Sequence, residues 1–418
     1  MASHSRPRRL WTAALTAVLA VLVAACAQEP NSIFHSHTDA NRDVAHLWDL
    51  LIWLGTGVFV LVESILILTL IKFRKREGQA EPKHVHGNTQ MEILWTALPA
   101  VILAFIAVPT VRTIFKTQAV ASADALQVEV MGHQWWWEFK YPQYGIVTAN
   151  ELYLPIGRKV NFTLQTQDVI HSFWIPQLNG KRDLISNRKN FLWFTPDSIT
   201  ASVLNGFCAE YCGSSHANMR FKTFVVAPPD FDAWAKHQQL PAAFNTMAKP
   251  DTTKKDVKPA ATMVAAVSAA QAAPATESFV SFPREQIPAY AVPGTPTPAG
   301  LSWDTTLAGD PARGEKIVTG VGTCLGCHMV KGNPMMVSII GPNLTHIASR
   351  TTIAGGLYPN DKQHLGLWIK NARLMKPGAL LMPTLGKDQY DPILKSPYKM
   401  GLTDQQIADV VAYLQALK

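Results

Sequence analysis

The stretch Asn205-Gly-Phe-Cys-Ala-Glu-Tyr-Cys-Gly-Ser-Ser-His-Ala-Asn-Met-Arg-Phe221 gathers four soft metal ligands into one short segment. Cys208 and Cys212 are four residues apart, His216 follows four residues later, and Met219 follows three after that. Thiolate, imidazole and thioether together form the ligand set that copper prefers. The segment therefore predicts a copper site.

Two thiolates so close together can each bridge two metal ions, which predicts a compact centre of two coppers and two sulfurs. Such a centre needs one nitrogen ligand for each copper, so a second histidine is required. His171, in the segment Asp168-Val-Ile-His-Ser-Phe-Trp-Ile-Pro176, is the candidate. The Met219 sulfur and the Glu210 backbone carbonyl are candidates for weak axial ligands. A structural zinc site, or a disulfide between the two cysteines, is the alternative explanation of the same residues.

The pattern C-x-E-x-C-x3-H-x2-M resembles the loop that binds binuclear copper A in cytochrome c oxidase subunit II. The resemblance implies a cupredoxin domain and a Glu210 carboxylate that reaches a magnesium ion at the interface with subunit I; the alternative is a solvated loop charge. The stretch Gly132-His-Gln-Trp-Trp-Trp-Glu-Phe-Lys-Tyr141 resembles the family's aromatic segment. There an exposed aromatic passes electrons to copper A, and Trp135 holds that position. The middle ring, Trp136, is often tyrosine in the family.

A second redox motif lies near the C-terminus, where Cys324-Leu-Gly-Cys-His328 is a c-type haem attachment sequence. Cys324 and Cys327 are expected to form thioethers to the haem, and His328 to be an axial ligand of the iron. Gly341-Pro342-Asn-Leu344 resembles the turn whose proline carbonyl accepts the ring N–H of that histidine, a contact that orients the ligand.

The sixth iron ligand is expected to be a methionine, because a methionine raises the haem potential relative to a second histidine. Met382, in Lys376-Pro-Gly-Ala-Leu-Leu-Met-Pro383, resembles the ligand loop of cytochromes c, and Met375 is the alternative. The segments 310–317 and 402–417 predict helices, the second with Thr403 as its N-cap. Both resemble the terminal helices of class I cytochrome c.

The composition favours membrane segments, since hydrophobic residues make up 48% of the chain and charged residues only 16%. The formal net charge is +8, but residues 6–9 and 72–83 contribute three positive charges each. Both stretches flank apolar runs. The charge therefore indicates membrane topology and not nucleic-acid binding.

Apolar runs predict a leader and two membrane spans. Residues 1–25 resemble a secretory signal that ends at Cys26 in a lipoprotein-like box, which predicts lipidation of Cys26; ordinary cleavage, or retention as an anchor, is the alternative. Spans are predicted over 46–71 and 91–114, with the basic loop between them in the cytoplasm.

Glu92 lies at the cytoplasmic start of the second predicted span, in Gln90-Met-Glu-Ile-Leu-Trp-Thr-Ala-Leu-Pro99. This stretch resembles the matching helix of oxidase subunit II, where the glutamate lies at the entrance of a proton-uptake path into subunit I. The alternative is a carboxylate favoured by the helix dipole.

The region after the spans predicts strands. Residues 126–130 and 160–164 alternate with period two, and turn residues separate such runs, which predicts a sandwich or Greek-key barrel. Residues 230–300 are rich in Ala, Pro, Thr and Lys, which predicts a linker.

The resemblance covers residues 30–229 as oxidase subunit II and 301–418 as a fused cytochrome c, the arrangement of caa3-type oxidases. It implies electron flow from a soluble or membrane cytochrome donor through haem c and copper A to haem a and the haem a3–CuB centre of subunit I. There oxygen becomes water and protons are pumped. Subunit III is a further implied partner, and both soluble domains lie on the periplasmic face of a bacterial inner membrane. The alternatives are the copper A subunit of a nitric-oxide-reducing haem–copper enzyme, and a copper-delivery or redox lipoprotein.

The predicted organisation is a two-helix transmembrane hairpin, an all-β cupredoxin-like Greek-key domain and an all-α cytochrome c domain. Its segments are 1–25 signal peptide, 26–45 periplasmic segment, 46–71 first span, 72–90 cytoplasmic loop, 91–114 second span, 123–229 copper A domain, 230–300 linker and 301–418 cytochrome c domain.

Overall fold

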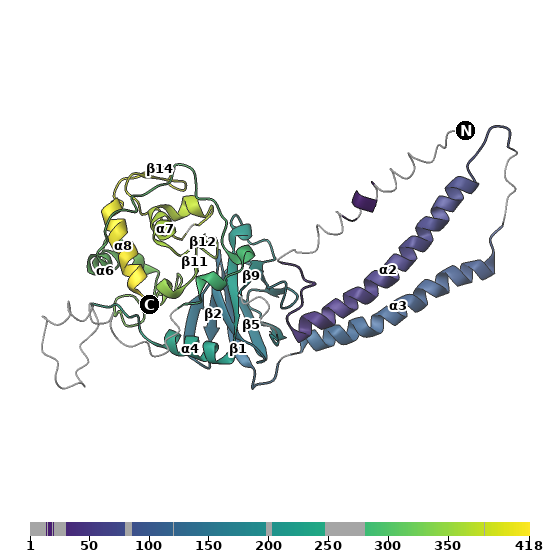
Figure 1. The fold of residues 1–418 in the computed structure, drawn as a ribbon, viewed down its shortest axis with the longest axis horizontal. Helices are drawn as coiled ribbons and strands as arrows, with labels where there is room; N and C mark the ends of the chain where they lie inside the picture. Colours follow the sequence, from purple (N-terminus) through teal and green to yellow (C-terminus); the bar gives the residue numbers. More distant parts are fainter. Residues whose placement is uncertain are drawn as a thin grey trace.

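The computed structural model describes residues 14, 16–18, 20, 31–79, 86–119, 121–197, 203–246, 281–379 and 381–418. Three parts follow one another along the chain: a helical hairpin, a β-sandwich and a mainly helical C-terminal domain (Figure 1). This arrangement confirms the predicted fold class. Cys26 and most of the predicted leader lie outside the described residues.

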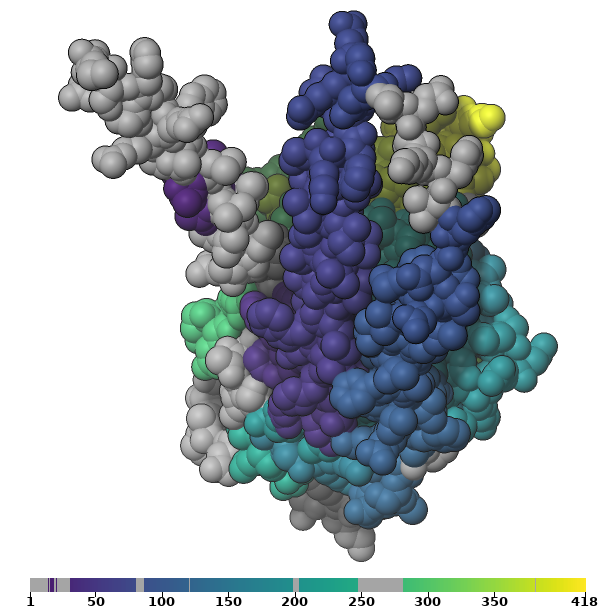
Figure 2. Space-filling view, turned by 90° about the vertical axis from the view of Figure 1, so that its right-hand side faces the viewer, coloured from purple at the N-terminus to yellow at the C-terminus, as the bar shows by residue number. Residues whose placement is uncertain are grey.

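The hairpin consists of α2 (Asp39–Lys72) and α3 (Thr89–Gln118), which meet next to the sandwich and diverge away from it (Figure 1); Figure 2 shows the hairpin in front of the two domains. Both are longer than the predicted spans, chiefly because residues 39–45 and 115–118 continue the helices at the ends nearest the sandwich. Their large apolar side chains face outward: Trp53 is 77% and Phe115 75% exposed. Such surfaces suit lipid, and both helices are long enough to cross a bilayer.

The base of the hairpin is fixed to the β-sandwich. The Asp39 carboxylate of α2 accepts a hydrogen bond from the Thr195 amide of the sandwich at 3.0 Å. The Arg182 guanidinium of the sandwich donates to the Gln118 side chain of α3 at 2.8 Å. An ion pair joins Arg42 to Asp197. The turn between α2 and α3 lies at the far end of the hairpin from the sandwich (Figure 1). These contacts set the sandwich at one membrane surface.

The sandwich, here called the copper domain, has two five-stranded sheets in the orders β3-β2-β1-β5-β8 and β4-β10-β9-β6-β7. Most neighbouring strands are antiparallel, but β1 pairs with β5 and β4 with β10 in parallel. The strands are β1 (Leu126–His133), β2 (Trp136–Tyr141), β3 (Ile146–Ala149), β4 (Glu151–Pro155), β5 (Val160–Thr166), β6 (His171–Trp174), β7 (Arg182–Leu184), β8 (Asn190–Phe194), β9 (Val203–Cys208) and β10 (Arg220–Val226).

Aromatic rings fill the space between the sheets. Phe173 stacks on Phe221 at 5.0 Å between ring centroids, and Phe139 and Trp137 meet the same cluster edge-on. Burial of such rings dominates core energetics. The core lies directly beneath the end of the sandwich that carries the predicted copper ligands, so those loops rest on a rigid base.

The C-terminal domain, here called the haem domain, is built around crossed helices. They are α6 (Pro311–Val318), α7 (Lys362–Met375) and α8 (Asp404–Ala416), with short 3-10 turns η4 (Cys324–Gly326) and η5 (Ile347–Ser349) and two small hairpins, β11 (Thr352–Ile353) with β12 (Tyr358–Pro359) and β13 (Gln389–Asp391) with β14 (Ser396–Tyr398).

Helices α6 and α8 cross closely at Gly314. A Cβ atom at this glycine would lie 2.1 Å from the Asp409 carbonyl oxygen, so no larger residue fits without moving a helix. The predicted cap is present, because Thr403 accepts from the Gln406 amide and Gln406 returns the bond in a capping box. The two predicted terminal helices are therefore where the sequence places them.

The structure differs from the prediction of a linker over residues 230–300. Helix α4 (Pro228–Gln239) packs Phe231 and Trp234 on the copper domain, with Trp234 stacked 4.6 Å from Tyr153. Further on, Phe282 packs on Phe224 of the copper domain at 5.0 Å, near the turns η2 (Arg284–Gln286) and η3 (Ala289–Ala291). Buried aromatics therefore order both described parts of this region, despite its polar and proline-rich composition.

Candidate copper and haem sites

The six predicted copper donors converge at one end of the copper domain. His171 begins β6 and Cys208 ends β9, and these strands pair at Phe173 and Cys208. The Cys208 sulfur lies 3.8 Å from His171 Nδ1 and 3.2 Å from the Glu210 carbonyl oxygen. One strand pair and the loop after it thus bring together ligands from two distant segments.

The second half of the cluster lies in the loop that joins β9 to β10. The Cys212 sulfur is 3.7 Å from the Cys208 sulfur, 3.6 Å from His216 Nδ1 and 3.8 Å from the Met219 sulfur. A disulfide needs its sulfurs about 2.05 Å apart, so both thiols are free. Each sulfur faces the other and one imidazole, which fits two thiolates that bridge a pair of copper ions.

Asp168 orients His171, a role that the sequence reading missed. Its carboxylate lies 2.8 Å from His171 Nε2 and also accepts from the Gln134 and Val169 amides, both at 2.7 Å. The Asp168 bond occupies Nε2 and leaves Nδ1 turned toward Cys208, the usual role of a carboxylate behind a metal-binding histidine. Its position three residues before His171 was the available signal.

The electrostatics of this cluster favour a bound cation. Burial opposes a charge on His171, but the hydrogen bonds to Asp168 and Cys208 outweigh it and raise the pKa of the imidazole. The contact with the Cys212 thiol lowers the pKa of Cys208, and the same contact raises the pKa of Cys212. One thiol of the pair thus favours the thiolate, which is the metal-binding form of cysteine.

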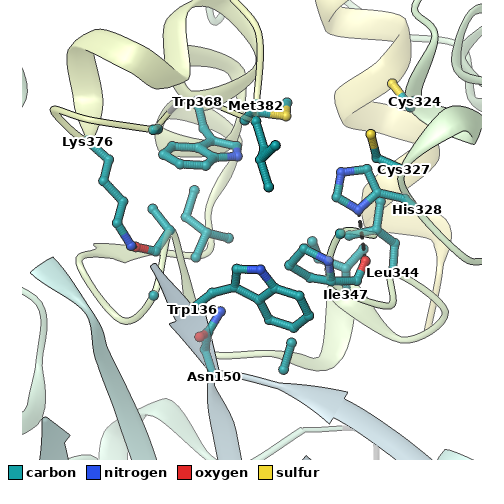
Figure 3. Close-up of a pocket in the computed structure, with 18 of the residues that line it drawn as sticks. Trp136, Asn150, Cys324, Cys327, His328, Leu344, Ile347, Trp368, Lys376 and Met382 are labelled. Carbon is teal, nitrogen blue, oxygen red and sulfur yellow. Dashed lines mark hydrogen bonds between the residues drawn. The ribbon is translucent and has the colours of Figure 1, made fainter. Parts of the chain in front are cut away.

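The haem attachment residues line a cavity of about 280 Å³ at the boundary of the haem and copper domains. Cys324, Cys327 and His328 lie on one wall, and Met382 lies across from them (Figure 3). His328 Nδ1 donates to the Pro342 carbonyl at 2.8 Å, as the turn predicts, which leaves Nε2 available to iron. The cavity walls are mainly apolar side chains, so the residues present fit a haem.

The structure distinguishes the candidate methionines by position. Met382 lines the cavity and its sulfur is drawn opposite His328 (Figure 3). Met375 is 2% exposed and packs in the core, with its carbonyl accepting from Tyr358 at 2.8 Å. This arrangement favours Met382 as the haem ligand.

Trp135 is not the exposed aromatic that the resemblance implied, because the haem domain covers it. Its side chain is 6% exposed, and its Nε1 donates to the Cys212 carbonyl at 2.9 Å. Lys376 of the haem domain donates to the Trp135 carbonyl at 2.5 Å, and a Cβ atom at Gly378 would lie 3.4 Å from the ring. The ring therefore lies between the copper loop and the haem domain.

Other predicted residues lie apart from this boundary. Glu210 is exposed on the copper loop, with its carbonyl toward Cys208, and the described chain places no partner on its carboxylate. Glu92 lies in the first turn of α3, which Asn88 caps, at the end of the hairpin far from the copper domain. Both carboxylates are thus accessible to another subunit.

The fold and the two sites define a membrane-anchored electron-transfer subunit with a copper centre and a c-type haem. Family models match residues 32–113 as cytochrome c oxidase subunit II, transmembrane domain, 145–226 as its periplasmic domain, and 311–418 as cytochrome c. The chain belongs to the cytochrome c oxidase subunit II family, in the form that carries a C-terminal cytochrome c domain. These domains imply copper A and haem c.

Curated relatives span both halves of the chain. Cytochrome c oxidase subunit 2 of Alkalihalophilus pseudofirmus is 29% identical over 86% of this chain and 83% of its own length. The same subunit of Bacillus sp. strain PS3 is 31% identical over 83% and 80%. The crystal structure of the periplasmic domain of subunit II of cytochrome oxidase of Bradyrhizobium japonicum is 28% identical, covers 29% of this chain and 97% of that one, and has a TM-score of 0.27.

The chain is thus the subunit through which electrons enter a haem–copper oxidase, an oxidoreductase complex whose subunit I is its partner. It is a membrane protein with its copper and haem domains outside the bilayer.

Proposed function

We propose that electrons pass from a cytochrome donor to haem c, then to a two-copper centre held by His171, Cys208, Glu210, Cys212, His216 and Met219, and then to subunit I. There oxygen is reduced to water with proton pumping. Each group, when bound, takes up and releases one electron. The remaining work belongs to the protein, which holds the ligands in a dry and rigid site.

The contact between the haem domain and the copper loop supports this order. Ser215, next to His216, donates to the Pro377 carbonyl at 2.6 Å, and Lys376 bonds to the Trp135 carbonyl. The segment that precedes Met382 therefore rests on the segment that holds the copper ligands. Because this contact covers Trp135, an external donor has no access to that ring, and the haem domain is the accessible acceptor.

Anaerobic stopped-flow reduction of the purified complex tests the proposal. Copper reduction by the cytochrome donor should follow haem c reduction, at a rate independent of protein concentration. A chain that ends at Gly300 should keep its copper spectrum but lose rapid reduction of copper by the same donor. Equal copper reduction rates in the full and shortened chains would show that haem c lies off the path.

Finer assignments rest on the family resemblance and the topology. We infer a bacterial inner membrane with subunit III as an additional partner, lipidation of Cys26, a magnesium ion held by Glu210 at the subunit I interface, and a proton path that begins at Glu92. For Glu92, the Gln variant should slow oxygen reduction and leave copper reduction unchanged. Unchanged turnover would return Glu92 to the role of a helix-start carboxylate.

A further inference from the structure

The haem cavity has a wall that belongs to the copper domain. Cytochrome residues form most of the lining, and the copper domain completes it with Gln134, Trp135, Trp136, Ala149 and Asn150. Figure 3 shows the indole of Trp136 entering the cavity from the copper domain, below Met382 and beside Leu344 and Ile347. We propose that Trp136 is a haem-pocket wall supplied across the domain boundary, which limits water access to the haem and thereby sets its reduction potential.

Trp136 is aimed at the cavity by its strand position. It starts β2, pairs with His133 on β1, and stacks on that imidazole with ring centroids 4.1 Å apart and planes 4° apart. Its neighbours Trp135 and Trp137 belong to the core of the copper domain, whereas Trp136 does not. The side chain is nevertheless only 8% exposed, because the haem domain lies against it.

A buried carboxylate fixes the two domains in this position. Glu151 of β4, 3% exposed, accepts from the Thr351 amide at 2.7 Å, the Thr351 hydroxyl at 2.7 Å and the Thr352 amide at 3.0 Å. Nearby, Asn343 donates to the Val147 carbonyl at 3.1 Å, one residue after the proline that orients His328. These hydrogen bonds lie on both sides of Asn150 in the chain. They therefore hold the copper-domain wall of the cavity in a fixed position relative to His328.

The expected consequence follows from solvation. Water near a haem favours the oxidised form, which carries one more positive charge, and the apolar shell around a redox site therefore tunes its potential. An indole at the boundary excludes water from one side of the pocket. This inference rests on the proposed function only in assigning haem c to this cavity, and it holds whether or not haem c precedes copper A in the path.

The test is an optical redox titration of haem c in the purified complex with Trp136→Ala, Trp136→Leu and Trp136→Phe. Trp193→Phe is the matched control, because Trp193 is a 7% exposed indole of the same domain that does not line the cavity. We expect the potential to fall in Trp136→Ala, to recover in order of side-chain size in the Leu and Phe variants, and to stay at the wild-type value in the control.

Copper paramagnetic resonance in the same samples reports whether the copper domain remains folded. If Trp136→Ala loses the copper signal, the haem potentials of the Trp136→Leu and Trp136→Phe variants test the inference instead. A wild-type haem potential in variants that keep copper and attached haem would overturn the inference. Stopped-flow order of reduction in the wild-type complex tests the proposed path separately, so failure of one is distinguishable from failure of the other.

Discussion

The copper loop and the haem cavity are two redox sites in one chain, and they are assembled differently. All six predicted copper donors come from the copper domain, and five of them lie in the stretch from Cys208 to Met219. The haem cavity has its predicted covalent and axial residues in the haem domain but completes its wall with residues of the copper domain, among them Trp136 and Asn150. A site closed within one domain should respond only to local changes, whereas a shared site should also respond to domain docking.

Loss of one bridging thiolate should have the largest effect. Cys212→Ser should abolish the mixed-valence copper signal in paramagnetic resonance, because a serine oxygen does not replace a soft bridging sulfur. The haem should remain attached with an unchanged optical spectrum. A variant that retains the dinuclear signal would contradict the two-thiolate centre, and bound zinc in the wild-type protein would contradict the choice of metal.

Loss of the proposed iron ligand should give the next largest effect, confined to the haem. Met382→Ala should keep the haem covalently attached and lower its potential, since the soft sixth ligand is removed. Met375→Ala is the control, because it leaves a cavity in the core of the haem domain but keeps the proposed iron ligand. If the potential falls in Met375→Ala and not in Met382→Ala, the ligand assignment is reversed.

Removal of the Glu151 carboxylate, which joins the two domains, should show whether the copper site is insensitive to domain docking. Glu151→Ala leaves the Thr351 and Thr352 donors buried and unpaired, at a cost of roughly 1–3 kcal/mol in docking free energy. Amide hydrogen exchange at these threonines should speed up, while the copper signal stays constant. Glu151→Gln should retain part of the protection, and Glu129→Gln, on an exposed strand position, should have no effect.

Acidification should loosen the same docking more weakly. His346 of the haem domain lies 4.6 Å from His237 of α4, and burial, followed by the nearby His237, lowers the pKa of His346 to about 4. An exposed His346 has the ordinary histidine pKa of 6.5, so between pH 6.5 and 4 the unfolded or undocked state binds more protons than the docked state. The docked state therefore loses stability as the pH is lowered through this range. Between pH 7.5 and 5.5 the loss should be about 1 kcal/mol.

Protease release of the haem domain, measured as a function of pH, checks this expectation. His346→Gln should flatten the profile across that range, because a neutral amide keeps the donor to the Leu240 carbonyl without a titrating group. Arg350 and His237 stay in place, and burial also lowers the pKa of His237, so part of the slope should remain in the variant. A profile unchanged by the substitution would assign the pH dependence to another group.

The copper donors could be predicted from sequence because their geometry is local. A loop that joins paired strands brings Cys208, Cys212, His216 and Met219 together, and the pairing of β6 with β9 adds His171. The haem motif is equally local. Both terminal helices of the haem domain were predictable for the same reason, since a cap and an amphipathic pattern are properties of short segments.

The domain boundary could not be predicted in this way. Glu151 sits in the strand Glu-Leu-Tyr-Leu-Pro, and its partners lie two hundred residues further along the chain. Trp135 was expected to be exposed because the haem domain that covers it leaves no sign near it in the sequence. Helix α4 was missed because its mean hydropathy is low and Phe231 and Trp234 are the only large apolar side chains that it buries.

The path of the chain between the two domains has a consequence for neighbouring copies in a crowded membrane. After α4 the backbone pairs with the haem domain, where Ala242 donates to the Lys331 carbonyl at 3.0 Å. It later returns to the copper domain at Phe282, and enters the haem domain again at Leu301. Domain swapping is easy when a single connection serves as the hinge. The described contacts at Ala242 and Phe282 must both break before the haem domain can dock on another copy, so exchange of the cytochrome between neighbouring complexes should be slow.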